Sequence, residues 1–444
     1  MNKILVIGAG LSASTLIKYL LDNSSEYKWK ITVGDIDLKI AEQKTDGHAN
    51  GIAVQIDIND KEQINNFIKN NDVIISMLPA SFHPEVARMC LDNNKHMLTA
   101  SYVSEYIREL DKEARQKGII LANELGVDPG IDHMSAMKII DRIKNKGGKI
   151  LSFVSNTGGL VAPEYDNNPW NYKFTWSPRS VVLAGRGLAR FIKNGRYKYI
   201  PYNKLFTRTQ ITEVPGAGKF EYYPNRDSLC YRETYKLDNI PTMFRGTLRR
   251  PGFSEAWDVF VQLGCTDDSY EVEDIEKMTW YDFLNCFLRY QPEIPVEKKL
   301  VKYLKIEPEG VIMQKLRWLG IFENQKIGLK KGTPAKVLQH LLEKKWKLED
   351  DDKDMIVMQH KFIYELNGEK KEIISSMVIK GQNNIHTAMS ITVGLPLAIA
   401  TKFIMTGKIK EPGVHIPVKA DYYEPILDEL KEYGIDFVEE EKSF

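Results

Sequence analysis

The sequence has few cysteines, almost no net charge and no long hydrophobic run. The four cysteines, Cys90, Cys230, Cys265 and Cys286, form no Cys-x-x-Cys pair, so we expect reduced thiols and no disulfides. The 61 Lys and Arg residues nearly cancel the 60 Asp and Glu residues, which leaves no overall field to attract nucleic acid or an anionic membrane. No apolar run approaches the roughly 18 residues of a membrane-spanning helix, and no signal sequence precedes the first strand. We therefore expect a soluble, cytoplasmic protein that binds neither nucleic acid nor membranes.

Metal-binding motifs are also missing. His83 and Glu85 resemble the His-x-Glu of zinc deaminases, but no Pro-Cys-x-x-Cys accompanies them. A His-Glu-x-x-His motif does not occur either, which argues against a metallopeptidase. We expect no metal.

The first third of the chain has the pattern of a parallel sheet covered by helices on both faces. Short apolar segments alternate with helical stretches from Met1 to about Leu125. Six strands are predicted, at residues 4–7, 30–34, 52–58, 72–78, 96–100 and 119–122. Six is the number that a complete dinucleotide-binding domain needs, and ligands in such domains lie beyond the carboxyl ends of the strands.

A glycine turn follows the first predicted strand. In GAGLSA, Gly8 permits a sharp turn, Gly10 lets the backbone approach a pyrophosphate, and Ala13 allows the next helix to pack closely on the strand. The amino end of that helix, at Leu11 and Ser12, offers free N–H groups to the anion. These five residues are predicted to bind a dinucleotide.

Two further positions bear on the cofactor. Asp35, at the end of the second predicted strand, can accept hydrogen bonds from ribose hydroxyls, and it would repel a 2′-phosphate by an amount on the order of a few kcal/mol. NAD is therefore favoured over NADP. Lys39 in the next helix could approach a phosphate, so NADP stays open. Leu78 and Pro79, after the fourth strand, are suited to flank a cofactor ring.

The ends of the fifth and sixth strands carry polar groups. Ser101 and Tyr102 follow the fifth strand, and the string GVDPGIDH at 126–133 follows the sixth. Asp128 or Asp132 could bind an amine or relay a proton there. Asp132 could instead cap the following helix, and we expect His133 to be structural.

The chain beyond about residue 149 differs in composition from the first third. Residues 150–265 are rich in Gly, Pro, Tyr and Arg, which suits a surface that faces a substrate. Arg226, Arg245 and Arg249 could form bidentate bonds with carboxylates, so several of them suggest a substrate with several carboxylates. Helices are predicted at 278–288, 296–304, 309–319, 334–346, 384–393 and 397–405, the last two ended by Gly394 and Gly407, and strands at 149–156, 355–366 and 371–380.

These patterns predict an α/β fold with a Rossmann doubly wound parallel sheet, an α/β substrate domain and a small all-helical domain. The dinucleotide-binding domain is expected at 1–128, completed by about 384–444. The substrate domain is expected at 129–270 with about 350–383, and the helical domain at 271–349.

Segments along nearly the whole chain resemble the saccharopine reductase family, the saccharopine dehydrogenases that form L-glutamate. They are GAGLSA, ISMLPASFHP, ASYVSE, NELGVDPGIDH, GGKILSFVSNTGGLVAPEYDNNPWNYKFTWSPR, YYPNRDS, FRGTLRRPGF and MQHKF. The resemblance implies an NAD(P)-dependent oxidoreductase, usually a homodimer, that acts on the CH–NH group of donors. Its reaction would interconvert saccharopine with L-glutamate and 2-aminoadipate 6-semialdehyde in lysine metabolism.

The resemblance also implies roles for particular residues. Those that match the family's substrate contacts are Ser101, Tyr102, Asp128, Arg226 and Arg245 to Thr247. It assigns Arg226 to a substrate carboxylate, and Asp128 and Tyr102 to catalysis, through orientation of the amine and proton handling.

The chain departs from the family's fungal members at two places. Thr157 stands where they carry a cysteine, which removes any thiol role there. Asp35 and Ile36 stand where they carry a Cys-Arg pair, and the missing arginine favours NAD. Two alternatives remain: a dehydrogenase of another secondary amine such as carboxyspermidine, and a non-catalytic NAD-sensing Rossmann protein.

Overall fold

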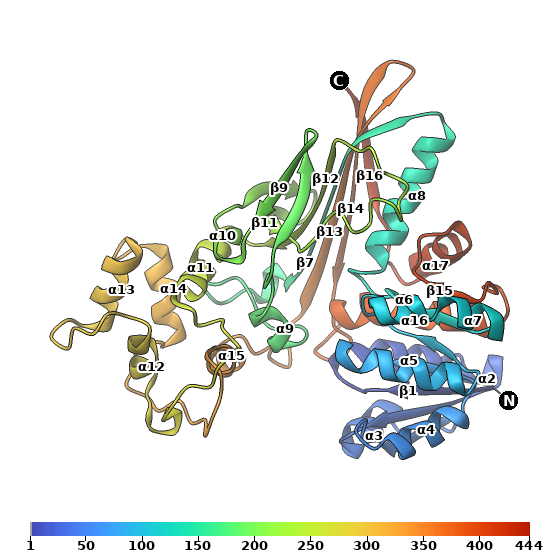
Figure 1. Ribbon diagram of the computed structural model, residues 1–444, viewed down its shortest axis with the longest axis horizontal. Coiled ribbons are helices and arrows are strands. Elements are labelled where there is room, and N and C mark those ends of the chain that lie inside the picture. Colours follow the sequence, from blue (N-terminus) through green and yellow to red (C-terminus); the bar gives the residue numbers. More distant parts are fainter. Residues whose placement is uncertain (1) are drawn as a thin grey trace. The chain divides into compact units, whose positions relative to one another are not determined.

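The computed structural model describes residues 2–444, and the chain divides into two compact units (Figure 1). The first unit runs to Ile150 and includes Glu365–Glu369 and Ile379–Val438. The second consists of Leu151–Tyr364, Lys370–Val378 and Glu439–Phe444.

The first unit continues past residue 128, the boundary expected from the sequence. Helix α8 (Ile131–Asn145) packs in this unit against α17 (Ala420–Glu432), where Tyr423 donates a hydrogen bond to Asp141 at 2.8 Å. The last strand, β16 (Val438–Ser443), lies at the edge of the second unit's sheet, although the sequence analysis assigned 384–444 to the first.

The sheet of the first unit is parallel, with the strand order β15-β6-β5-β4-β1-β2-β3. Its strands are β1 (Asn2–Ile7), β2 (Trp29–Asp35), β3 (Gly51–Gln55), β4 (Val73–Ser76), β5 (His96–Leu98), β6 (Ile120–Ala122) and β15 (Gly413–His415). The chain moves outward from β1 through β2 and β3, then returns to the other side of β1 and continues through β4 to β6. This reversal defines a doubly wound sheet. The six predicted strands are confirmed, and β15 adds one that was not predicted.

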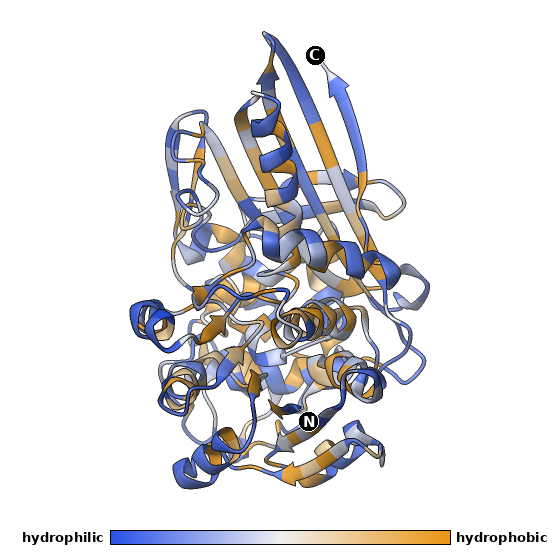
Figure 2. Ribbon diagram, turned by 90° about the vertical axis from the view of Figure 1, so that its right-hand side faces the viewer, coloured by the Kyte–Doolittle hydropathy of each residue, from blue (hydrophilic) through white to orange (hydrophobic). Residues whose placement is uncertain are grey.

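Helices complete the layers of this unit. They are α1 (Ser14–Asp22), α2 (Ser24–Tyr27), α3 (Leu38–Thr45), α4 (Lys61–Lys69), α5 (His83–Asp92), α6 (Glu105–Glu109), α7 (Asp111–Lys117) and α16 (Ala388–Met405), together with α8 and α17. Figure 2 shows hydrophobic residues in the strands of the sheet and hydrophilic residues on the outer helices. Because helices cover both faces, Ile4–Ile7 are buried without alternation.

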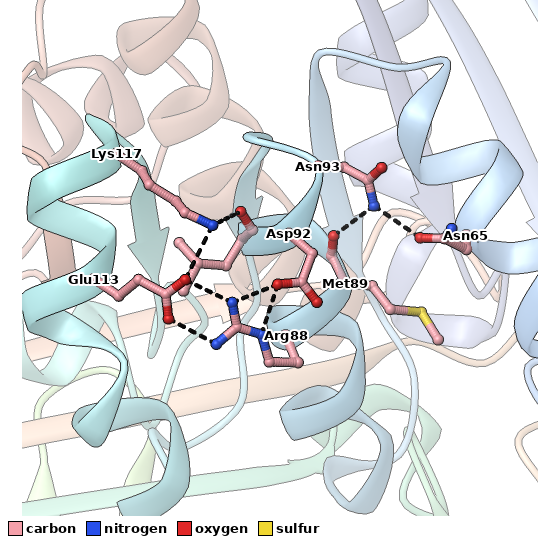
Figure 3. A network of polar contacts seen from close by, with 8 residues as sticks. Asn65, Arg88, Met89, Asp92, Asn93, Glu113 and Lys117 are labelled. Atoms are coloured by element: carbon pink, nitrogen blue, oxygen red, sulfur yellow. Dashed lines mark hydrogen bonds and ion pairs between the residues drawn. The ribbon is translucent and has the colours of Figure 1, made fainter.

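A network of ion pairs joins α5 to α7 (Figure 3). Two guanidinium nitrogens of Arg88 donate to the carboxylate of Glu113, each at 2.8 Å, and Lys117 lies 3.0 Å from the same carboxylate. The hydrogen bond from Arg88 lowers the pKa of Glu113 to about 2. These side chains are about one-third exposed, so solvent screening keeps their contribution to stability small.

Helix α16 corrects the prediction of two helices separated at Gly394. One helix continues through Gly394 and Pro396. The glycine has a packing role instead, because its missing side chain allows α1 to come close. A Cβ atom at Gly394 would lie 2.7 Å from the backbone nitrogen of Leu16. By length and composition α16 could cross a membrane, which the sequence analysis did not expect, but 83% of it is buried within the folded chain.

The second unit contains a mixed nine-stranded sheet. Seven of its strands follow the order β10-β11-β12-β7-β13-β14-β16, and the other two branch off, with β8 paired to β12 and β9 paired to β8. Its further strands are β7 (Lys149–Val161), β8 (Ala189–Lys193), β9 (Arg196–Ile200), β10 (Gln210–Val214), β11 (Gly218–Pro224), β12 (Thr242–Arg249), β13 (Asp354–Leu366) and β14 (Glu369–Lys380). The strands predicted at 149–156, 355–366 and 371–380 are confirmed.

The helices of the second unit are α9 (Pro178–Val182), α10 (Tyr202–Leu205), α11 (Phe253–Leu263), α12 (Trp280–Cys286), α13 (Val296–Leu304), α14 (Val311–Leu319) and α15 (Pro334–Lys345). The four helices predicted between residues 278 and 346 are confirmed, and Thr333 caps α15 by accepting a hydrogen bond from the backbone of Lys336. The helices from α12 to α15 share a hydrophobic core with Trp170 and α11. The chain therefore divides into two compact units rather than three.

Candidate active site

The turn after β1 has the backbone geometry of a phosphate-binding loop. Gly8 has a φ of +98°, and a Cβ atom there would lie 2.9 Å from the carbonyl oxygen of Met77. Gly10, in contrast, has no neighbouring atom within 4 Å of its ideal Cβ position, so the backbone is open to a ligand. Residues Leu11–Ala13 form a short 3-10 turn that leads directly into α1. A pyrophosphate fits here, against the positive end of the helix dipole.

Asp35 stands against this turn. As the last residue of β2, it accepts a hydrogen bond from the backbone N–H of Ala9 at 2.8 Å through Oδ2 and one from Asp37 at 3.1 Å through Oδ1. The carboxylate is thus fixed beside the glycine turn, as a ribose-binding acid requires. The next residue, Ile36, is 64% exposed and offers no cation to a phosphate.

Leu78 and Pro79 follow β4, the neighbour of β1 in the sheet. The backbone of Met77 donates to the carbonyl of Ile7 at 2.8 Å, so the chain leaves β4 beside the end of β1. Leu78 is half-buried and Pro79 is exposed. Their place on the carboxyl edge, next to the glycine turn, suits the flank of a cofactor ring.

Ser101, Tyr102 and Asp128 come together beyond β5 and β6, which are adjacent strands. The backbone N–H of Glu124 donates to the carbonyl of Ser101 at 3.0 Å, which ties the two loops to each other. The hydroxyl of Tyr102 lies 3.5 Å from Oδ1 of Asp128. The two residues assigned to proton handling therefore lie side by side.

A buried acid and histidine lie behind these loops. Glu124 and His133 are almost completely buried, and their side chains approach to 2.7 Å. The other oxygen of Glu124 accepts the backbone N–H of Val103 at 3.0 Å, so this carboxylate links the loop after Tyr102 to α8. His133 therefore belongs to a buried polar pair, and its structural role stays a prediction. Asp132 accepts the backbone N–H of Gly130 at 2.7 Å, at the start of the helix.

Sequence reasoning did not identify the surroundings of His83. Its ring is buried, and its two nitrogens lie within hydrogen-bonding distance of Ser76 and Ser101. Burial lowers the pKa of His83 to about 4. The sequence signal was the place of His83 in the segment that leads from the fourth strand into the next helix, and the His-x-Glu pattern directed attention to metals instead. Among residues 2–444, no cluster of three potential metal ligands occurs.

Arg226, Arg245 and Thr247 belong to the second unit. Arg245 and Thr247 lie on the same face of β12, because side chains alternate along a strand. The backbone N–H of Asn225 donates to the carbonyl of Arg245 at 2.8 Å, which places Arg226 next to that strand. Arg245 is buried, and its guanidinium lies 4.8 Å from the ring centre of Tyr231.

Two other residues of the second unit have structural surroundings. Arg249 is buried over the rings of Tyr172 and Phe253 and donates to the carbonyl of Leu248, so it packs in an aromatic core. Thr157, at the position of the fungal cysteine, pairs in register with Thr247 on the neighbouring strand.

The doubly wound sheet, the glycine turn and the acid at the end of β2 define a dinucleotide-binding protein of the Rossmann class. Two family models match the chain: the saccharopine dehydrogenase NADP binding domain at residues 4–121, and the saccharopine dehydrogenase C-terminal domain at residues 126–435. The chain belongs to the saccharopine dehydrogenase family.

Similar proteins cover the full length of the chain. The saccharopine dehydrogenases (NADP(+), L-glutamate-forming) of Schizosaccharomyces pombe and Saccharomyces cerevisiae are each 34% identical, over 99% and 98% of this chain and the same shares of their own. The apo structure of the L-Glu-forming enzyme from Saccharomyces cerevisiae matches with a TM-score of 0.89 at 34% identity, covering 100% of both chains.

A homospermidine synthase from Legionella pneumophila in complex with NAD matches with a TM-score of 0.56 at 11% identity, covering 100% of this chain and 92% of its own, and supports the fold alone. The resemblance to the family and the Rossmann fold are thus confirmed. The cytoplasmic location and the homodimer stay predictions.

Proposed function

We propose that this protein is an L-glutamate-forming saccharopine dehydrogenase. The reaction oxidises the CH–NH group of saccharopine and, after addition of water, releases L-glutamate and 2-aminoadipate 6-semialdehyde, and it is reversible. The observation that carries the proposal is the full-length match to enzymes of that name, at 34% identity and a TM-score of 0.89, in a chain that holds Tyr102 and Asp128 together.

The first unit supplies the cofactor site. A nicotinamide dinucleotide, when bound, supplies the hydride acceptor. The turn at Gly8 and Gly10 fits its pyrophosphate, because one glycine has no room for a Cβ atom and the other leaves the backbone open. Leu11, Ser12 and Ala13 continue this turn, and Leu78 with Pro79 would flank the ring.

NAD is the cofactor that the local chemistry favours. Asp35 is held beside the glycine turn, where its carboxylate would accept ribose hydroxyls and repel a 2′-phosphate. The fungal relatives are named for NADP. The exposed side chain of Ile36 has no charge with which to bind that phosphate. We infer that this chain differs from those relatives in cofactor preference.

Each unit holds residues that the family resemblance assigns to saccharopine. Arg226 and Arg245 would each bind a carboxylate through charge-assisted, bidentate hydrogen bonds, and Thr247 would add a hydroxyl. Asp128 would accept a hydrogen bond from the secondary amine. Tyr102 would orient Asp128 and pass protons at its phenol oxygen.

A steady-state assay tests the proposal directly. The purified protein is mixed with saccharopine and either NAD or NADP, the reduced nicotinamide is followed by absorbance, and glutamate is measured as product. We expect turnover, strong loss in Asp128→Asn and Arg226→Ala, and normal rates in Arg196→Ala, which removes an exposed arginine from β9. Absence of turnover with either cofactor would refute the proposal. Turnover of carboxyspermidine in place of saccharopine would support the alternative amine dehydrogenase.

A further inference from the structure

Three hydroxyl groups surround the buried ring of His83. Ser76, the last residue of β4, lies 3.0 Å from Nδ1, and Ser101 lies 2.7 Å from Nε2. The hydroxyl of Thr99 is 3.4 Å from Nε2 and accepts the backbone N–H of Ser101 at 3.2 Å. The imidazole therefore bridges the carboxyl ends of two adjacent strands and touches a residue of the candidate substrate site.

The buried hydroxyl of Ser76 determines which nitrogen of His83 carries the proton. A neutral imidazole has one N–H donor and one acceptor nitrogen. Ser76 has no exposed surface, and within residues 2–444 its hydroxyl has only Nδ1 of His83 as a hydrogen-bond partner. Leaving that hydroxyl hydrogen without an acceptor would be costly. Thr99 is a competing buried hydroxyl at Nε2, but its contact of 3.4 Å is longer than the 3.0 Å contact of Ser76, so Ser76 donates to Nδ1. Nε2 then carries the proton and donates to Ser101.

This assignment fixes the direction of the hydrogen bond at Ser101. Because Oγ of Ser101 accepts from Nε2 of His83, its own hydroxyl hydrogen points to another acceptor. Ser101 is half-buried, so that acceptor can belong to a ligand. Donors that follow one another in this way polarise each other, which makes the last hydroxyl a better donor to an anion.

We propose that His83 is a positioning residue that holds Ser101 as a hydrogen-bond donor to a carboxylate of the bound substrate. This inference rests on the proposed function, since saccharopine supplies the carboxylate. Among the residues that the structure describes, the two ring nitrogens meet only hydroxyl groups; the ring acts through its tautomer, so no change of charge on His83 is involved.

Kinetics separate this role from a purely structural one. His83→Leu should raise the KM for saccharopine about tenfold, the effect of losing one oriented hydrogen bond to a charged group, while the KM for the dinucleotide changes less than about twofold. His83→Gln retains an N–H donor and should recover most of the loss. The pH profile of kcat/KM should keep its shape, because the neutral ring does not exchange a proton in the reaction.

A double-mutant cycle with Ser101 gives the sharper test. In a Ser101→Ala background, His83→Leu should cause no further rise in the KM for saccharopine, because the two residues act as one unit. The matched control is His96→Leu, which removes another imidazole at the opposite end of β5, where it accepts the backbone N–H of Ile120 at 3.0 Å. That control should leave the KM unchanged. An equal tenfold loss in both backgrounds would overturn the inference.

The tautomer can be read without any substrate. In protein labelled with 15N-histidine, two-bond nitrogen–hydrogen correlations should show the proton of His83 on Nε2, and Ser76→Ala should weaken that preference. A proton on Nδ1 in the wild-type protein would overturn the positioning role, even with saccharopine turnover intact. Failure of the wild type to turn over saccharopine would instead count against the proposed function. The two failures are therefore distinguishable.

Discussion

We predict that two substitutions at the end of β2 reverse the proposed preference for NAD. We choose Asp35→Asn combined with Ile36→Arg, because the side-chain oxygen of asparagine can still accept the backbone N–H of Ala9, now 2.8 Å from the Asp35 carboxylate. The simpler Asp35→Ala would lose this bond, loosen the glycine turn and weaken the binding of both dinucleotides. Arginine has room at position 36, where the isoleucine is 64% exposed.

The size of the effect follows from Coulomb's law. At a separation of about 5 Å and an effective dielectric constant of about 20, the carboxylate of Asp35 repels each negative charge of a 2′-phosphate by about 3 kcal/mol. The phosphate carries more than one charge, whereas salt screens the exposed part of the interaction. A net gain of about 3 kcal/mol for NADP corresponds to a change of about 100-fold in relative binding.

The assay compares kcat/KM for NAD and NADP at saturating saccharopine. We expect the ratio of NADP to NAD use to rise about 100-fold in the double variant. Asp60→Asn is the matched control, because it removes an equivalent charge from the cap of α4, where Asp60 accepts the backbone N–H of Gln63 at 3.0 Å. A wild-type protein that prefers NADP, or a ratio that stays the same in the double variant, would refute the reasoning.

Three further predictions concern stability and substrate binding. Burial lowers the pKa of His83 from 6.5 to about 4, so the unfolded state binds more protons than the folded state between these pH values. The stability that the neutral ring contributes is therefore complete above pH 6.5, and it falls by about 3 kcal/mol as the pH drops toward 4. Urea unfolding of the wild type and of His83→Gln, each at neutral and at mildly acidic pH, measures how much more stability the wild type loses on acidification. Equal losses in the two proteins would contradict the prediction. Gly394→Ala should lower the free energy of unfolding by about 1–3 kcal/mol through its clash with the backbone of Leu16. Gly332→Ala should cost less by the same measurement, because its Cβ would meet side-chain atoms alone, those of Lys336 at 3.3 Å and Leu329 at 3.9 Å. Arg226→Lys should raise the KM for saccharopine at least about tenfold and leave the KM for the dinucleotide unchanged, because lysine keeps the charge but loses the bidentate geometry. An unchanged KM for saccharopine would exclude Arg226 from the site.

The parallel sheet of the first unit could be predicted because its strands are buried apolar runs with a known winding order. The strand β15 could not, since Gly413–His415 includes a single apolar side chain, that of Val414. The break placed in α16 shows the opposite error. Gly394 and Pro396 look like a helix end in the sequence, but the glycine is required by the close approach of α1, and only the fold shows which residue lies opposite.

In the candidate site, too, the sequence indicates where residues lie along the chain but not which residues they contact. Tyr102 and Asp128 were predictable because each follows a strand that ends at the ligand edge of the sheet. The hydrogen bonds that hold their loops were not, since Glu124 meets Val103 and His133 only after three separate segments have folded together. No spacing in the sequence encodes that meeting.

His83 and His133, two of the buried histidines of the first unit, show why neighbours matter more than position. Each lies in the first turn of a helix that follows a strand, His83 in α5 and His133 in α8, so the sequence places them in equivalent settings. The partners separate them. His133 meets the carboxylate of Glu124, and this polar pair braces α8 against the neighbouring loop. The nitrogens of His83 meet the hydroxyls of Ser76, Ser101 and Thr99, so its contribution depends on which nitrogen holds the proton, and the serine buried at the end of β4 determines this.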